Sequence, residues 1–166
     1  MKKFAISILF IFLLAGCNSN LFASRQDKII DEIDNKTLNF QYAKLSLSNF
    51  LSLLNLGQYQ QALSYFQGDF NYLASLNLES NQNDKAELLK RFCTVNGGKC
   101  LKFMIINQEE LSANEYQYTV QFLNNDGAVY ATPGCPCKGG GKTQFYFKVK
   151  KITEGQFVVT DLPPKE

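Results

Sequence analysis

The chain contains no histidine and no tryptophan among its 166 residues. Histidine is the commonest general base, the imidazole of catalytic triads and the commonest metal ligand, so its absence removes the usual route to each of these chemistries. Phenylalanine and tyrosine are abundant by contrast, with 14 and 8 residues. This composition is more typical of an aromatic hydrophobic core than of an active site.

An excess of charge is also missing from most of the chain. The whole sequence has 17 basic and 15 acidic residues, and two of the basic ones, Lys2 and Lys3, stand at the very N-terminus. From residue 17 onward the charges therefore balance. Nucleic-acid binding relies on basic residues that neutralise phosphates, so this balance does not predict a nucleic-acid partner.

The first seventeen residues have the organisation of an export signal. Lys2 and Lys3 precede an apolar run from residue 4 to residue 15 that only Ser7 interrupts. A bilayer-spanning helix needs about 20 apolar residues, so this run is too short to span and predicts a secretory signal peptide. An uncleaved anchor, or an ordinary signal with a chance cysteine, is the alternative.

The end of this signal, Leu14-Ala15-Gly16-Cys17, resembles the lipobox of bacterial lipoproteins. The resemblance implies cleavage before Cys17, a diacylglyceryl group on its sulfur and acylation of its new amino group, commonly with palmitate. Two or more acyl chains anchor a protein stably to a membrane. We therefore expect a lipid-anchored protein of the cell envelope. Asn18 follows the cysteine, which by resemblance to the sorting pattern of Gram-negative lipoproteins implies the outer membrane, facing the periplasm.

Composition divides the chain into three parts: a signal peptide at 1–16, a lipidated tether at 17–37 and a domain at 38–166. The tether is mostly polar and mixed in charge, with one short helical turn expected near Asp27–Ile33.

Helical periodicity comes first in the domain. Apolar residues at Leu47, Phe50, Leu51 and Leu54 share one helical face, and Gly57 is a stop signal. A second short helix is predicted by the same spacing at Tyr59, Ala62, Leu63 and Phe66, which we expect to pack on a sheet. Asp84 is expected to cap a third helix that runs to Phe92.

Strand periodicity follows after Cys100. Apolar and polar residues alternate in four segments, around residues 101–105, 116–122, 145–149 and 157–159. One apolar and one mostly polar face is the pattern of a half-buried antiparallel sheet. The order of elements predicts an α+β domain in which N-terminal helices pack on a curved, four-stranded antiparallel sheet.

The stretch from Asn49 to Phe66 resembles the opening of small NTF2-like (cystatin-like) envelope proteins, with a helix, a turn at Gly57, an aromatic at Tyr59 and Ala62-Leu63-x-x-Phe66. Tetratricopeptide helices use similar spacing, but they occur as repeats and no second copy exists here. The resemblance covers about residues 40–162 and implies a curved sheet. This fold hosts enzymes, binders and scaffolds alike, and the chain lacks the histidine and the acid–base pair typical of its enzymes. The concave face of such a sheet can leave an apolar pocket, for which Tyr116, Tyr118 and Phe147 are candidate lining residues.

Four cysteines remain besides Cys17: Cys93, Cys100, Cys135 and Cys137. In an exported domain an even number predicts disulfides, and four allow three pairings. An antiparallel meander brings the start of its first strand to the same end as the loop between its second and third strands. We therefore predict that Cys93 and Cys100 pair with Cys135 and Cys137, two bonds that would each contribute about 3–4 kcal/mol. A Cys135–Cys137 bond across Pro136 is the alternative; it would be strained and readily reduced. A zinc site fits the spacing poorly, so we expect no metal and no cofactor.

The sequence thus favours a non-enzymatic envelope lipoprotein that binds a partner protein or a small apolar ligand. Two alternatives remain open: a thiol–disulfide redox protein using Cys135 and Cys137, and a structural accessory of a secretion or pilus assembly.

Overall fold

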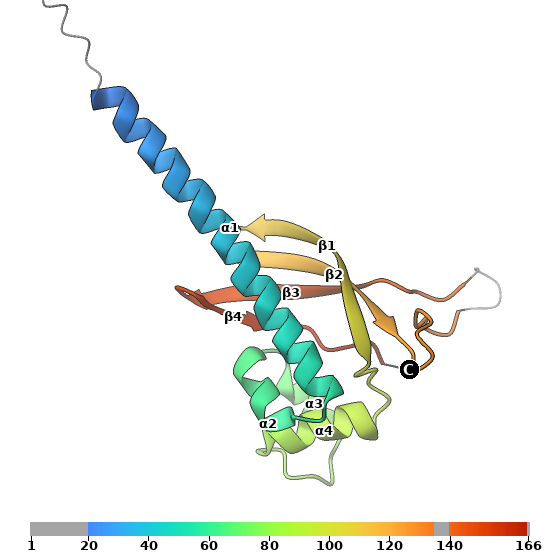
Figure 1. The fold of residues 1–166 in the computed structure, drawn as a ribbon. Helices are drawn as coiled ribbons and strands as arrows, with labels where there is room; N and C mark the ends of the chain where they lie inside the picture. Colours follow the sequence, from blue (N-terminus) through green and yellow to red (C-terminus); the bar gives the residue numbers. More distant parts are fainter. Residues whose placement is uncertain (1–19, 135–139, 166) are drawn as a thin grey trace, which may run out of the picture. The chain divides into compact units, whose positions relative to one another are not determined.

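The computed structural model describes residues 20–134 and 140–165, and their side chains from residue 35 onward. Cys17, Cys135 and Cys137 lie outside the described residues, as does the predicted signal peptide. The chain divides into two units, residues 1–35 and 36–166; the second contains all of the sheet and is described here (Figure 1).

Helix α1 spans Asn20–Asn55 and is longer than the sequence pattern predicts. The sequence predicts one short helical turn near Asp27–Ile33 in this part of the chain, whereas the backbone is helical from Asn20 onward. The segment contains no glycine or proline, so nothing in it ends the helix. The helix stops where Gly57 takes a left-handed conformation with φ of 73°. Gly57 N–H donates to the Leu54 carbonyl and Gln58 N–H to the Leu53 carbonyl, which is a Schellman motif.

The remaining helices are short and begin at recognisable caps. They are α2 at Tyr59–Ala62, the 3₁₀ turn η1 at Leu63–Tyr65, α3 at Phe70–Ser75 and α4 at Lys85–Thr94. The Asp69 carboxylate accepts hydrogen bonds from two backbone amides of α3, and the Asp84 carboxylate accepts one from Glu87 N–H at the start of α4. The predicted cap at Asp84 is therefore confirmed, and α4 ends two residues beyond the predicted Phe92.

Four strands form one antiparallel meander in the order β1-β2-β3-β4. They are β1 at Lys102–Ser112, β2 at Glu115–Leu123, β3 at Phe145–Thr153 and β4 at Gln156–Val159. Phe103 lies opposite Phe122, and Tyr118 lies opposite Phe147, so the predicted apolar positions share one face. The register shifts between Ile105 and Asn107, which is why the apolar alternation of β1 stops there.

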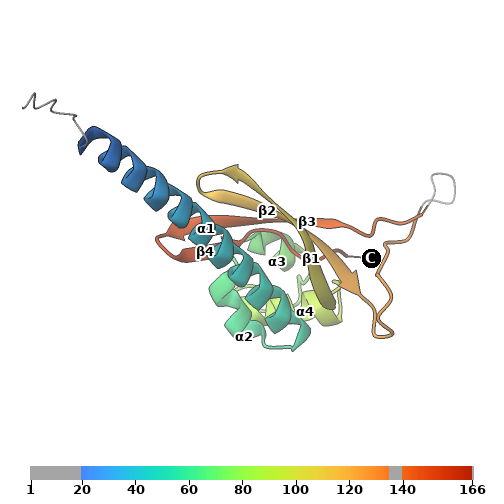
Figure 2. The same ribbon diagram turned by 45° about the horizontal axis from the view of Figure 1, so that its top comes forward.

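The core lies between this face and the helices (Figure 2). Helix α1 contributes Ala43, Leu47, Phe50, Leu51 and Leu54, all at most 2% exposed. Inward residues of β2, β3 and β4 complete the cluster, and Phe103 and Ile105 of β1 pack against it while partly buried. The fold-class prediction is confirmed: helices come first and pack on an open, four-stranded antiparallel sheet.

The predicted second helix packs on this core as expected at two positions and partly at two others. Ala62 and Phe66 are buried, whereas Tyr59 and Leu63 are partly buried against the cluster. The Phe66 ring stacks on Phe50 at 4.9 Å, and Phe66 also bridges to Val159 of β4. The edge of the sheet at β4 is therefore covered at this point.

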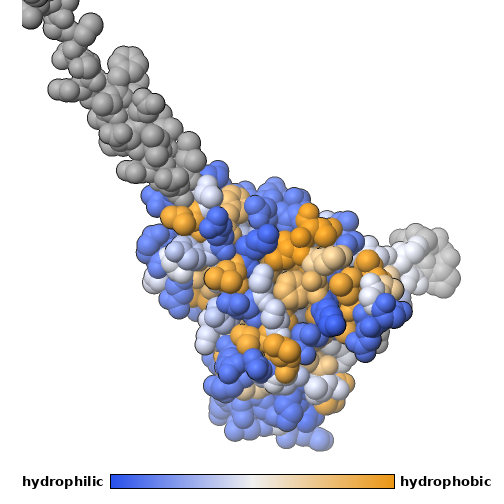
Figure 3. Space-filling model, in the orientation of Figure 1, coloured by the Kyte–Doolittle hydropathy of each residue, from blue (hydrophilic) through white to orange (hydrophobic). Residues whose placement is uncertain are grey.

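Polar and apolar side chains are unevenly distributed over the surface. Figure 3 shows a mostly hydrophilic surface at the bottom of the view, where Figure 1 places helices α2–α4. Hydrophobic side chains gather higher up, on the side of the view that faces the 140–144 segment. Exposed apolar residues of β1 include Met104 and Ile106, at 43% and 44%.

Candidate functional site

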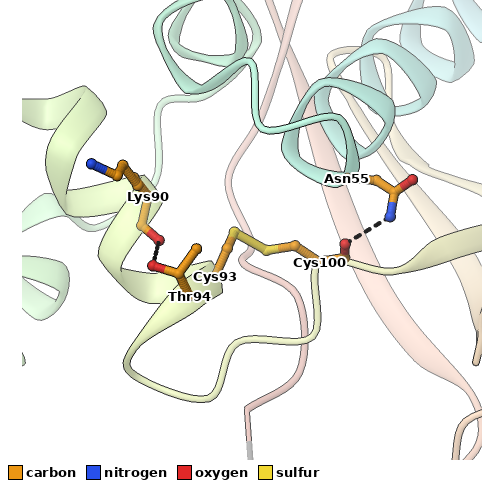
Figure 4. The surroundings of a disulfide bond; sticks show 5 residues. All are labelled: Asn55, Lys90, Cys93, Thr94 and Cys100. Atoms are coloured by element: carbon orange, nitrogen blue, oxygen red, sulfur yellow. Dashed lines mark hydrogen bonds between the residues drawn. A yellow bond between two sulfur atoms is a disulfide. The ribbon is translucent and has the colours of Figure 1, made fainter.

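Cys93 and Cys100 form a disulfide bond with each other, with their Cα atoms 5.5 Å apart (Figure 4). The predicted pairing of Cys93 and Cys100 with Cys135 and Cys137 is therefore wrong. The chain reverses between α4 and β1, where Gly97 has φ of 81° and Gly98 N–H donates to the Phe92 carbonyl. A Cβ added at Gly98 would overlap the Phe92 ring, so only glycine allows so tight a reversal.

The disulfide also joins the end of α4 to the start of β1, and a hydrogen bond adds the end of α1 to this junction. Asn55, the last residue of α1, donates its side-chain amide to the Cys100 carbonyl at 2.9 Å. Cys93 lies in the last turn of α4, where the Thr94 hydroxyl donates to the Lys90 carbonyl. The end of α1, the end of α4 and the start of β1 are thus joined at one point, as Figure 4 shows.

A groove of about 490 Å³ opens beside this junction, between the end of α1 and the start of β1. We call it the α1–β1 groove; its lining residues are Ser52, Asn55, Leu56, Lys102, Phe103 and Leu123. Leu56 belongs to the Schellman turn that ends α1, and it is 68% exposed. Three apolar residues, two neutral polar residues and one lysine therefore surround a space large enough for several side chains of a ligand.

A second, more polar cleft of about 360 Å³ lies between the turn after α1 and the start of α4. Its carboxylates are already engaged, because Asp84 caps α4 and Glu87 accepts from Lys90 Nζ at 3.0 Å. Carboxylates held in this way are structural, and nothing in the cleft marks one of them as a general acid or base.

Tyr116, Tyr118 and Phe147, the candidate pocket residues, are core side chains at most 1% exposed. Their hydroxyl and ring contacts are internal: Tyr118 donates to the Phe40 carbonyl of α1 at 2.9 Å, and Tyr116 packs edge-on against the Phe40 ring. Burial raises the pKa of Tyr118 above that of an exposed tyrosine, and burial followed by the nearby Glu110 carboxylate raises the pKa of Tyr116. The burial supports core packing for these three residues rather than contact with an external ligand.

The long connection between β2 and β3 is closed by a hydrogen-bonded neck. Thr132 N–H donates to the Lys142 carbonyl, and Lys142 N–H donates to the Thr132 hydroxyl, both at 3.0 Å. A Cβ at Gly141 would overlap the carbonyl oxygen of Thr132. Gly141, the last glycine before Lys142, therefore allows the two sides of this loop to approach each other at Thr132.

The described ranges, 20–134 and 140–165, lack two features. They contain no group of three histidine, cysteine, aspartate or glutamate side chains placed to hold a metal ion. They also contain no helix long and apolar enough to cross a membrane.

Comparisons with known proteins give no relative: no family model, no curated protein and no solved structure matches this chain. The α1–β1 groove was not anticipated from the sequence. Its residues come from three separate segments, and a signal for it exists only in the apolar Leu56 placed directly before the helix-ending Gly57.

Proposed function

We propose that this chain is a lipid-anchored protein of the bacterial envelope, attached through acyl chains on Cys17, whose domain acts by binding rather than by catalysis. The feature that carries the proposal is the signal Met1–Cys17 with its lipobox-like end. The Cys93–Cys100 bond supports it independently, because structural disulfides persist in oxidising compartments outside the cytosol.

Binding is the activity that the described surface supports best. The α1–β1 groove is open and lined by three apolar residues and three polar ones, of which Lys102 is the one charged group. Sites of this composition hold apolar portions of a ligand and use few polar groups to orient it. A partner protein or a small apolar ligand fits this description.

Membership of the NTF2-like family belongs to the same proposal. Its support is the order of the elements, with helices followed by an open antiparallel meander, together with the residues from Asn49 to Phe66. The fold is compatible with binding proteins and does not itself specify a ligand.

Replacement of Cys17 by serine tests the anchor. The wild-type protein should sediment with membranes, and its N-terminal peptide should carry the mass of a diacylglyceryl and an acyl group. The Cys17→Ser variant should be released from the membrane fraction. Lipid anchoring would be excluded if the variant stayed in the membrane fraction and the mass of its precursor were the same as that of the wild-type precursor. Chemical cross-linking in intact cells should in addition give one stoichiometric adduct if the protein is an accessory of a larger assembly.

A thiol–disulfide function is the second candidate, and the Cys93–Cys100 bond favours it. Because these two cysteines are paired, Cys135 and Cys137 are left to pair with each other, to stay reduced, or to bond to another molecule. In a redox cycle a partner's dithiol would attack the Cys135–Cys137 bond, leaving two reduced thiols here and a disulfide in the partner. Alkylation of the thiols in buffers of stepped redox potential tests this: Cys135 and Cys137 should titrate together at a higher potential than Cys93 and Cys100.

A further inference from the structure

The balanced charge of the mature chain conceals a basic end of the domain. The register, hydrogen bonds and ring contacts bring residues 98–103, 123–132, 142–145 and 163–165 to one end of the sheet. These segments contain Lys99, Lys102, Lys142 and Lys165 but only one acid, Asp126. Basic residues therefore outnumber acidic residues in these four segments, although the domain as a whole is close to neutral.

Local contacts hold two of these lysines at this end. Tyr130 stacks on Phe145 with ring centroids 6.1 Å apart. Lys99 Nζ lies 5.7 Å from the centre of the Tyr130 ring, and Lys142 Nζ lies 5.4 Å from that of Phe145. Two cations thus flank one aromatic pair. Lys165 is brought near by the bridge between its backbone and Gly98.

The opposite end of the domain is different. Lys36 of α1 pairs with Glu110 of β1 at 2.6 Å, and Lys151 pairs with Glu154 at 2.9 Å. Acids and bases therefore offset each other where the second unit begins at Lys36. The basic residues lie at the other end of β1, because α1 contacts Glu110 through Lys36 and reaches Cys100 at its last residue, Asn55.

The α1–β1 groove lies at the basic end, and the strand beside it is an edge strand. Lys102 both lines the groove and begins β1, whose only strand neighbour in the described sheet is β2. An edge strand can accept an extended segment of another chain through backbone hydrogen bonds. Leu56, Phe103 and Leu123 then offer apolar contacts beside that edge.

We propose that the α1–β1 groove and the adjoining edge of β1 bind an extended, acidic segment of a partner protein, which inserts an apolar side chain between Leu56 and Phe103 and places a carboxylate near Lys102. Charge complementarity selects this occupant: an acidic segment is attracted to Lys102, Lys142 and Lys165, whereas a basic segment or a second copy presenting the same basic end is repelled. The proposal rests on the proposed binding function and names its surface and its partner.

A defined peptide tests the proposal without knowledge of the natural partner. The protein is the mature chain carrying Cys17→Ser, which keeps every other mature residue and needs no detergent. The probe is a fluorescein-labelled decapeptide of alternating aspartate and leucine, and its controls replace aspartate by lysine or leucine by serine. Fluorescence anisotropy should show saturable binding of the Asp/Leu probe alone, weakening as salt is added.

Matched variants locate the binding. Lys102→Glu should weaken binding about fivefold through loss and reversal of one rim charge. Lys148→Glu, the same change at an exposed position of β3, should leave it unchanged. Leu56→Asp should weaken binding about tenfold, whereas Leu78→Asp, at a residue 76% exposed outside the groove, should not. Leu56 is itself 68% exposed, so the Leu56→Asp variant should have the same melting temperature as the parent protein.

Three results would overturn the proposal: no binding of the Asp/Leu probe, equal binding of the Lys/Leu probe, or equal weakening by Lys102→Glu and Lys148→Glu. Binding to vesicles of phosphatidylethanolamine and phosphatidylglycerol that Lys102→Glu abolishes, without peptide binding, would assign the basic end to a membrane surface instead. The fractionation of the Cys17→Ser variant does not depend on peptide binding. A failure of the peptide-binding proposal can therefore be distinguished from a failure of the lipid-anchor proposal.

Discussion

Removal of the Cys93–Cys100 bond should destabilise the domain by a modest and calculable amount. The bond closes a ring across a sequence separation of only 7 residues. In the chain-entropy model a ring of this size stabilises the folded state by about 2.4 kcal/mol, less than the 3–4 kcal/mol expected for each long-range bond of the rejected pairing. We predict that joint replacement of Cys93 and Cys100 by alanine lowers the free energy of unfolding by about this amount. For a domain of this size the melting temperature should fall by about 8 °C.

The measurement is urea and thermal unfolding of the mature chain, oxidised and reduced, followed by circular dichroism. The matched control is joint replacement of Cys135 and Cys137 by serine, which leaves the Cys93–Cys100 ring intact. This control should unfold like the parent protein when oxidised and should lose about 2.4 kcal/mol when reduced. The reasoning is refuted if the control is destabilised as much as the Cys93/Cys100 variant, or if non-reducing peptide mapping joins either of these residues to Cys135 or Cys137.

Three further predictions follow from packing and burial. Phe66→Ala should cost about 3–5 kcal/mol in urea unfolding, because the ring is 5% exposed and stacked on a neighbouring phenylalanine; a wild-type melting temperature would mean that Phe66 does not pack on the core. Gly141→Ala should break the neck to Thr132, and amide exchange at Thr132 should speed up while the sheet stays protected; unchanged exchange would contradict the close approach. Tyr118→Phe should cost about 1 kcal/mol at neutral pH, because it removes the hydrogen bond to Phe40. Burial raises the pKa of the folded-state hydroxyl, so the unfolded chain ionises first and wild-type stability should fall above about pH 10; an equally steep fall in the phenylalanine variant would exclude this cause.

Much of the fold was predictable from local sequence pattern. The two-residue period from Tyr116 to Phe122 specifies a strand with one buried face, and the carboxylate of Asp84 specifies a helix start, because both depend only on near neighbours. The Ala62 and Phe66 positions were predicted in the same way. The limits of this reasoning appear at the ends of elements: only a short helical turn near Asp27–Ile33 was predicted before the domain, whereas helix α1 begins at Asn20.

What the sequence determined by itself is therefore the order of the elements and the face that each one buries. The export signal ending in Cys17 stays a prediction from the sequence. The cysteine pairing was decided by the folded structure. The chain reversal at Gly97 brings Cys93 and Cys100 to each other. The α1–β1 groove and the basic end were likewise decided by the tertiary structure. Their residues are far apart in a chain whose charges sum to nearly zero, and only the packing of α1 beside β1 places Leu56 and Lys102 along one surface.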